Sequence, residues 1–518
     1  MITKHDYVVI GAGSAGCVIA NRLTEDSDTT VLLLEAGSPP NLPEHQVPLG
    51  WIKLWGTEVD WAYSTEEEPY INNRKIYCPR GKALGGSSAI NAMIYIRGSR
   101  YDYDRWQELG NVGWSYQDVL PYFKKSENQQ RGASEFHGVD GLLSVTDPLA
   151  PSIISQRFVE AGAALGYGLN PDFNGAQQQG AGLYQLTIKD GKRHSTAEAF
   201  LRPILDRPNL TVTTSALVTR LLFDGTRTVG VEYLHDGAIH QSFVYQEVIL
   251  SAGAIDSPKL LMLSGIGHAD RLQALDIPVV VDLPGVGQNL QDHLHVAVAH
   301  QATQDLQPAP TSNIAEAGLF LHTEGRLDAA PDLQFFSGPV LWTHPTYARE
   351  GSGFVATACL TNPQSRGSVS LRSASPKDPS VIRMNYLRSQ SDLQKLLTGI
   401  KIIRQIFHSN IFDEFRGEEA APSVDNHTDE ALSAYIRETC DTVYHPVGTC
   451  KMGTDPDSVV DPELRVHGVE GLRVVDASIM PTITTGNTNA PTIMIGEKAA
   501  DLIKATAQVP HQRLELTK

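Results

Sequence analysis

The chemistry that this sequence can support begins at a glycine-rich turn near its start. Gly11, Gly13 and Gly16 follow the apolar run 7–10 and open a segment with the apolar spacing of a helix. The first glycine of such a turn allows the tight bend, the second lets a pyrophosphate approach the backbone, and the third lets helix and strand pack closely. The helix N-terminus offers free N–H groups and a positive dipole end to phosphate. The residues expected to hold a dinucleotide here are Gly11, Gly13, Ser14, Ala15 and Gly16.

A carboxylate stands where a nucleotide ribose would need it. The apolar run 31–34 ends at Glu35, about 20 residues after the last glycine of the turn, and an acid at this distance accepts hydrogen bonds from the ribose hydroxyls. A glycine-rich turn without a ligand is the weaker interpretation, because strand, turn, helix, second strand and acid are all in register.

The rest of the sequence has no second complete glycine triplet after a strand. The nearest match, 285–287, follows Pro284 and lacks the third glycine. An enzyme that passes hydride between a nicotinamide and a flavin normally needs two dinucleotide sites. A single site with a large remainder favours FAD, which carries its own redox group, over NAD.

Length and composition are typical of a large, loop-rich globular enzyme. The 518 residues exceed one ordinary domain, and 41% are hydrophobic. The formal net charge of -17 and the lack of a basic patch argue against nucleic acid as a partner. Five cysteines without a CxxC pair predict reduced thiols, a cytoplasmic location and no metal site. We expect neither a signal peptide before the first strand nor a membrane span.

Two further stretches rich in small or aromatic residues could line a site. Gly85, Gly86 and Ser87 lie in a run of small residues that could present several backbone N–H groups to a phosphate or to the edge of a flavin ring. Taken alone, this run could also be a flexible loop. The tryptophans and tyrosines of residues 50–80 are interpreted first as packing and second as the wall of a pocket.

Periodicity predicts the elements between these stretches. Residues 208–250 alternate apolar and polar side chains, which predicts an antiparallel meander that leads into a parallel strand. We expect the next helix to begin at Ser257-Pro258, because proline is preferred in a first helical turn. The segment 128–148 is rich in Gly, Asp and Ser and predicts a surface excursion, in which His137 is expected to be solvated.

Together these segments resemble the glucose–methanol–choline (GMC) family of FAD-dependent oxidoreductases over nearly the whole chain. Residues 81–98 and 253–267 are similar to the first and second family signatures, and residues 287–293 and 475–481 are similar to further family motifs. The resemblance implies an α/β fold (α+β overall). A Rossmann-like FAD-binding domain is built from discontinuous segments, and a substrate domain caps the flavin with an antiparallel sheet.

The resemblance also implies how the chain divides between the two domains. We expect the FAD-binding domain to comprise residues 1–150, 196–300 and 460–518, and the substrate-binding domain to comprise residues 151–195 and 301–459. The strands expected in the dinucleotide-binding sheet are 7–10, 31–35, 248–252 and 472–476.

The resemblance assigns a catalytic pair. His445 matches the active-site histidine of the family, and Asn487 matches its partner position, which is His or Asn in the family. Oxidation of an alcohol needs a base for the hydroxyl proton, for which an imidazole is suited, and an amide can hydrogen-bond the developing alkoxide. The other cofactor-binding residues that the resemblance implies are Asn91, Ala92, Met93, Ile94, Val218, Asp476, Ala477 and Thr488, with Asn487 as well.

Two positions bear on how this chain compares with choline-oxidising members of the family. Ile90 stands where some of them carry a histidine bonded covalently to the flavin, so we expect non-covalent FAD here. Glu316 stands where they carry a glutamate that could face a cationic substrate, although a structural acid is the preferred interpretation.

The implied function is FAD-dependent oxidation of a primary alcohol to an aldehyde. Choline and aliphatic alcohols are the candidate substrates, and oxygen or a quinone-like carrier is the candidate electron acceptor. A flavin-dependent lyase or fatty-acid photodecarboxylase on the same scaffold is the alternative enzyme, and a flavin carrier is the alternative without catalysis. The intact pair of His445 and Asn487 favours alcohol oxidation.

Overall fold

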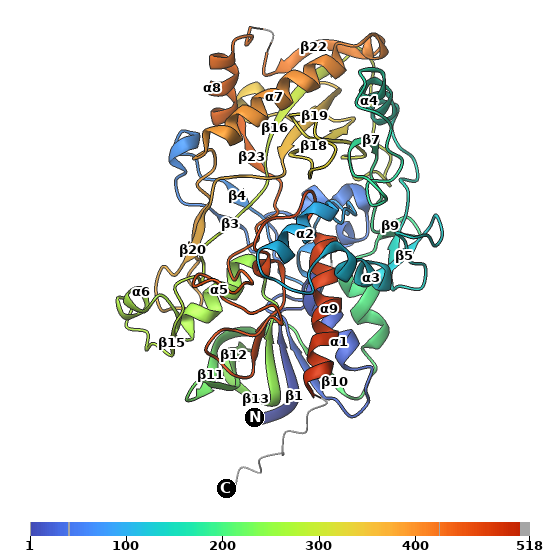
Figure 1. Cartoon of the computed structure of the whole chain (residues 1–518). Coiled ribbons are helices and arrows are strands. Elements are labelled where there is room, and N and C mark those ends of the chain that lie inside the picture. The colour runs from blue at the N-terminus through green and yellow to red at the C-terminus, as the bar shows by residue number, and fades with distance from the viewer. Residues whose placement is uncertain (1, 40–41, 424, 508–518) are drawn as a thin grey trace.

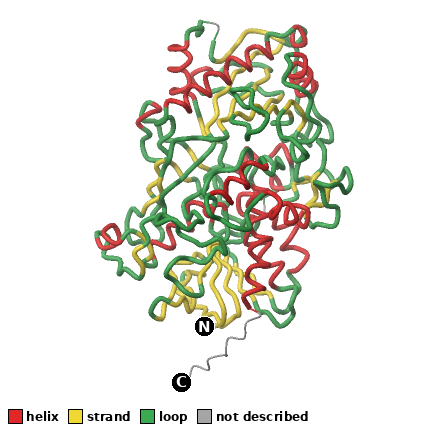
Figure 2. The backbone as a smooth tube through the Cα atoms, in the orientation of Figure 1, coloured by secondary structure: helices red, strands yellow, loops and turns green. Residues whose placement is uncertain are grey.

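The computed structural model describes residues 2–39, 42–423 and 425–507. The strands of this part gather mainly in two seven-stranded sheets, one near each end of an elongated molecule (Figure 1). Figure 2 shows that most of the chain between the sheets consists of loops and helices. Within the described part, no helix combines the length and apolar character needed to cross a membrane.

The first sheet carries the four strands that were expected to form the dinucleotide-binding sheet. Its order is β10 (Leu210–Thr213), β2 (Val31–Leu34), β1 (Ile2–Ile10), β13 (Ala238–Leu250), β12 (Arg227–His235) and β11 (Leu217–Asp224), with β24 (Leu472–Val474) also paired to β13. The four central strands β2, β1, β13 and β24 run parallel. Where they pair, the segments 7–10, 31–34 and 248–250 are continuously apolar and buried, because both faces of the sheet are covered there. The helices α1 (Ser14–Leu23) and α9 (Asn489–Ala507) pack against each other beside this sheet.

The second sheet is antiparallel throughout. Its order is β22 (Arg416–Ala421), β16 (Leu294–Ala302), β19 (Gly353–Leu360), β18 (Leu333–Gly338), β17 (Ala317–Leu321) and β7 (Gly180–Leu183), with β23 (Asp441–Thr442) also paired to β16. The helices around it are α4 (Ile153–Ala164), α7 (Gln390–Phe407) and α8 (Asp429–Thr439). These helices lie at the far end of the molecule from the N-terminus, so the opposite face of the sheet is left to meet the first half of the molecule (Figure 1).

Shorter elements connect the two sheets. The remaining helices are α2 (Arg100–Glu108), α3 (Tyr116–Ser126), α5 (Gly253–Leu263) and α6 (Ala269–Gln273). The remaining strands pair as β3 (Tyr63–Ser64) with β4 (Tyr77–Cys78), β5 (Glu127–Gln129) with β6 (Leu143–Val145), β8 (Ile188–Lys189) with β9 (Lys192–Arg193), β14 (Ile266–Gly267) with β15 (Val281–Asp282), and β20 (Ser368–Ser370) with β21 (Val381–Arg383). The domain division expected from the sequence stays a prediction.

Two expectations about individual elements are wrong. Strand β10 does not join the antiparallel meander but pairs parallel with β2, since alternation along a strand does not reveal the direction of its neighbour. Helix α5 begins at Gly253 and therefore contains Pro258 in its interior. A proline there cannot donate to the carbonyl of Ala254, and the Thr449 hydroxyl donates to that carbonyl instead, at 2.6 Å.

A buried carboxylate joins α2 to the loop that carries Asn487. Asp102 Oδ2 accepts the backbone N–H of Ser99 at 2.8 Å, which caps α2, and the backbone N–H of Thr485 at 2.7 Å. Asp102 Oδ1 accepts the Thr485 hydroxyl at 2.9 Å. The loop before α9 is thus held by a side chain that also caps the N-terminus of α2.

We expect the substitution Asp102→Ala to lower the thermal unfolding midpoint clearly, because it leaves buried donors without partners at about 1–3 kcal/mol each. The matched control is Asp118→Ala, since Asp118 closes the same kind of capping box on α3 but is exposed and makes no contact with this loop. Differential scanning calorimetry of the two variants checks the prediction. Equal losses in both would show that the link to Thr485 contributes no stability.

Candidate active site

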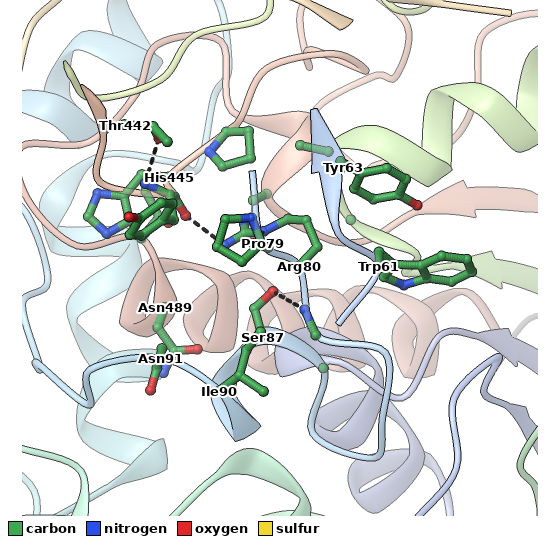
Figure 3. A pocket seen from close by; sticks show the side chains of 18 of the residues that line it. Trp61, Tyr63, Pro79, Arg80, Ser87, Ile90, Asn91, Thr442, His445 and Asn489 are labelled. Atoms are coloured by element: carbon green, nitrogen blue, oxygen red, sulfur yellow. Dashed lines mark hydrogen bonds between the residues drawn. The ribbon is translucent and has the colours of Figure 1, made fainter. Parts of the chain in front are cut away.

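A cavity of about 450 Å³ lies between the two sheets. Its lining runs from the carboxyl ends of β1 and β2 in the first sheet to residues of β16, β18 and β19 in the second. In parallel sheets, ligands bind at this carboxyl edge. Figure 3 shows the middle of the cavity, with His445 on one side and Trp61 and Tyr63 on the other.

Close backbone contacts shape the floor of the cavity. Gly11 has a φ of +96°, and a Cβ there would lie 2.5 Å from the Ser251 carbonyl oxygen. A Cβ at Gly16 would lie 1.9 Å from the Gly11 carbonyl oxygen, so this glycine serves the close packing of α1. A Cβ at Gly86 would lie 2.7 Å from Gly13 Cα. Two glycine-rich stretches far apart in the sequence therefore meet without side chains between them, and this bare backbone suits a pyrophosphate.

Glu35 lies in the cavity wall beside this turn. Its Oε2 accepts the N–H of Ala12 and its Oε1 accepts the N–H of Gly37, each at 2.8 Å. Burial raises the pKa of Glu35 to about 7. Each carboxylate oxygen keeps a second lone pair, so a ribose hydroxyl could still donate to it.

The cavity brings together nearly all residues that the sequence assigned to the site. Those that line it are Gly11, Gly13, Ser14, Ala15, Glu35, Gly86, Ser87, Asn91, Ala92, Met93, Ile94, Val218, His445, Asp476, Ala477, Asn487 and Thr488. Gly16 and Gly85 do not line it. Gly85 instead donates its N–H to the Ala12 carbonyl at 2.7 Å and so ties the two glycine-rich stretches together.

The expected catalytic pair lies at the far end of the cavity from Glu35. His445 Nε2 is 3.2 Å from Asn487 Nδ2, and the backbone N–H of His445 donates to Asp292 Oδ1 at 2.8 Å. Tyr444, just before it, has a left-handed φ of +69°, which costs energy in a non-glycine residue and often marks a functional site. Burial, followed by the neighbouring His293 and Arg80, lowers the pKa of His445 well below its usual range. The imidazole is therefore neutral at neutral pH and can accept a proton.

Aromatic rings surround the cavity next to this pair. Trp55 contacts Trp51 at 5.0 Å, Trp342 at 6.4 Å and Tyr444 at 4.8 Å between ring centroids. All four rings line the cavity, and we call them the aromatic cluster. Of the aromatic residues in 50–80, Trp51, Trp55, Trp61 and Tyr63 line the cavity, which is the second interpretation given to this stretch. Trp342 was missed, because a lone tryptophan carries no signal of the wall to which it contributes.

Charged groups also reach this end of the cavity. Burial raises the pKa of Asp441 to about 6, so its carboxylate is ionised at neutral pH. The Arg80 guanidinium donates to the carbonyls of Tyr444 at 2.7 Å and Pro79 at 2.6 Å. Sequence reasoning missed both residues, although Arg80 directly precedes the first family signature and Asp441 lies four residues before His445.

Asp476 connects the cavity wall to α5. Its Oδ2 accepts the Gly253 N–H at 2.8 Å and the Ser257 hydroxyl at 2.6 Å, and its Oδ1 accepts the Ser478 N–H at 2.8 Å. The Asp476 carboxylate lies at the N-terminus of α5, where negative charge stabilises a helix. This contact explains why α5 begins at Gly253, although its first turn contains no proline.

His137, expected to be solvated, is buried, with an exposed fraction of 6%. Its Nδ1 lies 3.1 Å from the Glu127 carboxylate and its Nε2 lies 2.8 Å from Asp172 Oδ2. Burial alone would lower the pKa of His137, but the hydrogen bonds with Asp172 and Glu127 outweigh burial and raise it. The expectation failed because these partners come from other segments. His137 does not line the cavity.

Glu316 lies away from the cavity lining. Its carboxylate accepts the Ser312 hydroxyl at 2.5 Å, the Ser155 hydroxyl at 2.8 Å and the Ser152 N–H at 2.7 Å. These contacts satisfy the buried charge and support the interpretation of Glu316 as a structural acid.

Residues of metal-binding type gather at one further place in the described chain. His300, His408 and Glu419 lie close enough to share an ion. Arg404 donates to both oxygens of Glu419, at 3.0 and 2.5 Å, and so already neutralises the only carboxylate of the group. This geometry gives no support to a metal centre.

Comparison with known proteins finds relatives over nearly the whole chain. Two family models, each described as GMC oxidoreductase, match residues 5–295 and residues 363–496. The chain is 44% identical to the mitochondrial choline dehydrogenase of Mus musculus, over 97% of this chain and 89% of the relative. It is 44% identical to the oxygen-dependent choline dehydrogenase of Cronobacter sakazakii, over 98% of this chain and 96% of the relative.

A solved structure shares the fold over the whole length of the chain. The crystal structure of pyridoxine 4-oxidase from Mesorbium loti superposes with a TM-score of 0.93 at 33% identity, covering 98% of this chain and all of the other. The fold expected from the sequence is confirmed. The chain belongs to the GMC oxidoreductase family and is an FAD-dependent oxidoreductase that acts on the CH–OH group of its donors.

Proposed function

We propose that this enzyme oxidises choline, or a closely related quaternary ammonium alcohol, to the aldehyde. The observation that carries the proposal is the position of the aromatic cluster, which contains Tyr444 and therefore adjoins His445 directly. Faces of Trp and Tyr rings attract quaternary ammonium groups. The ionised Asp441 in the same wall adds negative charge. The identity of 44% to choline dehydrogenases supports the same substrate.

The residues of the cavity fit FAD. The bare backbone around Gly13 and Gly86 would hold the pyrophosphate, Glu35 the adenosine ribose, and Val218 the adenine. Residues 91–94, with Asp476, Ala477 and Thr488, would hold the flavin end. When bound, FAD supplies the acceptor for the hydride that leaves the substrate carbon.

The chain's own residues handle the proton. His445 Nε2 takes the hydroxyl proton of the substrate, since the neutral imidazole has a lone pair available. Asn487 Nδ2, 3.2 Å from that nitrogen, donates a hydrogen bond to the oxygen as negative charge develops on it. The alcohol thus loses one proton to His445 and one hydride to the cofactor, and the product is the aldehyde.

A neutral aliphatic alcohol is the second candidate substrate. Arg80 lines the same cavity, and its positive charge opposes a cationic head unless the carbonyls of Pro79 and Tyr444 and the nearby carboxylates offset it. The relatives compared above are dehydrogenases or an oxidase, so the alternative of a lyase or a photodecarboxylase gains no support.

The proposal includes oxygen as the electron acceptor and the cytoplasm as the compartment. We place oxygen before a quinone-like carrier, because one relative is named as oxygen-dependent and another as an oxidase. Hydrogen peroxide formed in equal amount to the aldehyde would mark oxygen as the acceptor. A cytoplasmic, reducing compartment agrees with five cysteines that are all buried free thiols.

We expect His445→Ala to retain FAD but to slow flavin reduction by choline roughly 100-fold or more, the scale of a lost general base. Anaerobic stopped-flow absorbance measures this rate. The control is His467→Ala, since His467 does not line the cavity and its Nε2 lies 3.2 Å from the Gly453 carbonyl oxygen. A rate in His445→Ala equal to that of the native enzyme would reject the role of His445.

We expect Trp55→Leu to lower kcat/KM for choline by about 2- to 30-fold, because a cation–π contact contributes about 0.5–2 kcal/mol. The same substitution should lower kcat/KM for 3,3-dimethylbutan-1-ol, the uncharged isostere of choline, much less. Trp61→Leu is the matched control, since Trp61 lines the same cavity outside the cluster and its face is covered by Lys82 Nζ at 4.8 Å. Equal use of choline and its isostere by the native enzyme would favour the aliphatic alcohols instead.

We expect acid precipitation to release the flavin into the supernatant. Ile90 lines the cavity where some members of the family carry a histidine bonded to the flavin, and a hydrocarbon side chain cannot form such a bond (Figure 3). Absorbance spectra of supernatant and washed pellet check this prediction. Yellow colour that stays with the pellet would show a covalent link through another residue.

A further inference from the structure

A hydrogen-bond chain that begins at a backbone carbonyl ends on His445 Nδ1. His293 Nε2 lies 3.1 Å from the Thr361 carbonyl oxygen, which can only accept, so Nε2 carries the proton and donates. Burial lowers the pKa of His293 to about 3, so the ring is neutral and its Nδ1 has a lone pair. His445 Nδ1 lies 3.0 Å from this lone pair and must therefore donate to it. Neutral His445 is then left with its lone pair on Nε2.

A second chain reaches His445 from the opposite side. The Tyr184 hydroxyl donates to the Phe335 carbonyl at 2.7 Å, so its oxygen accepts from Gln334 Nε2 at 3.1 Å. The same amide group donates to Asn487 Oδ1 at 3.2 Å. Asn487 must therefore turn its Nδ2 toward His445, so Nε2 of His445 carries the lone pair and accepts from the amide until the substrate hydroxyl takes that place.

The two hydrogen-bond chains start at different carbonyls, and both place the proton of His445 on Nδ1 and its lone pair on Nε2. Thr361 follows β19, while Gln334 and Phe335 belong to β18, so both anchors come from the second sheet. Gln334 Oε1 is buried without a hydrogen-bond partner in the described structure. An unpaired buried carbonyl costs free energy, which an apolar side chain would avoid. In this structure the Gln334 side chain makes its hydrogen bonds through the NH₂ group alone.

We propose that His293 and Gln334 are positioning residues, which hold His445 with its proton on Nδ1 and Asn487 with its NH₂ group toward the substrate oxygen. The base and the hydrogen-bond donor are then set before the substrate arrives. The inference rests on the proposed role of His445 as the base. Neither His293 nor Gln334 lines the cavity, so neither touches the substrate and both act through the catalytic pair.

Nitrogen-15 NMR of the holoenzyme labelled at histidine tests the inference without turnover. Signals of His445 are identified by their loss in His445→Ala. At neutral pH we expect a protonated Nδ1 and an unprotonated Nε2 in the native enzyme, and a mixture of the two tautomers in His293→Leu. A protonated Nε2 in the native enzyme would overturn the inference, whatever the activity of any variant.

Anaerobic flavin reduction supplies the kinetic test. We expect His293→Leu to slow the limiting rate of reduction by about 10- to 100-fold with little change in the apparent Kd of the substrate, because a fraction of the molecules then presents the wrong nitrogen of His445. His293→Asn should recover most of the rate, since its Oδ1 can accept from His445 Nδ1. Gln334→Met should slow reduction as well, since it frees the Asn487 amide to turn. Native rates in both His293→Leu and Gln334→Met would overturn the inference.

The double variant separates this inference from the proposed function. In the background of His445→Ala, His293→Leu should add no further loss, because it acts only through that imidazole. An additional full loss there would show that His293 acts by another route. If His445→Ala itself reduces at the native rate, the proposed function fails. If His445→Ala is slow while both His293→Leu and Gln334→Met reduce at the native rate, only the present inference fails.

Discussion

The contact between two glycine-rich backbones supports everything else in the site. Gly13 and Gly86 approach so closely that a Cβ on Gly86 would lie 2.7 Å from Gly13 Cα, and the Gly85 N–H closes the contact on the Ala12 carbonyl. This contact fixes the loop 86–94 above the end of β1. The same residues then form one wall of the cavity, whose opposite wall comes from the second sheet.

Burial sets the protonation state of His445 in the cavity. Removed from water, His445 stays neutral at neutral pH and can act as a base. A hydrogen-bond chain that ends on a carbonyl has a definite direction, because a carbonyl oxygen can only accept. The low dielectric of the interior strengthens each hydrogen bond of such a chain. Both carbonyl anchors lie in or directly after strands of the second sheet, at Phe335 and Thr361. In the mechanism that we propose, a structural sheet thereby sets which nitrogen of His445 faces the substrate.

The aromatic cluster, with Asp441 and Arg80 nearby, is the part of the cavity on which the proposed substrate preference depends. Trp55 stands at the centre of three other rings, one of which belongs to Tyr444. Because Tyr444 precedes His445, the surface that would receive a cationic head is tied by the backbone to the base. Arg80 donates to the carbonyl of Tyr444 and so ties this aromatic wall to the backbone that positions the His445 imidazole.

What the sequence determined by itself was the local unit and the motifs. The glycine turn, the strands beside it and Glu35 could be predicted because strand period, helix period and turn chemistry act over about thirty residues. The catalytic role of His445 came only through the family resemblance, since one histidine among 17 shows no distinguishing pattern.

Only the tertiary structure decided which distant groups meet. It paired β10 in parallel with β2, let Thr449 satisfy the carbonyl that Pro258 leaves free, and buried His137 between two carboxylates. Gln334 and Asn487 are 153 residues apart in the sequence, yet their side chains share a hydrogen bond. Periodicity reports which face of an element is buried, but it does not report what lies against that face, and protonation states depend on that neighbour.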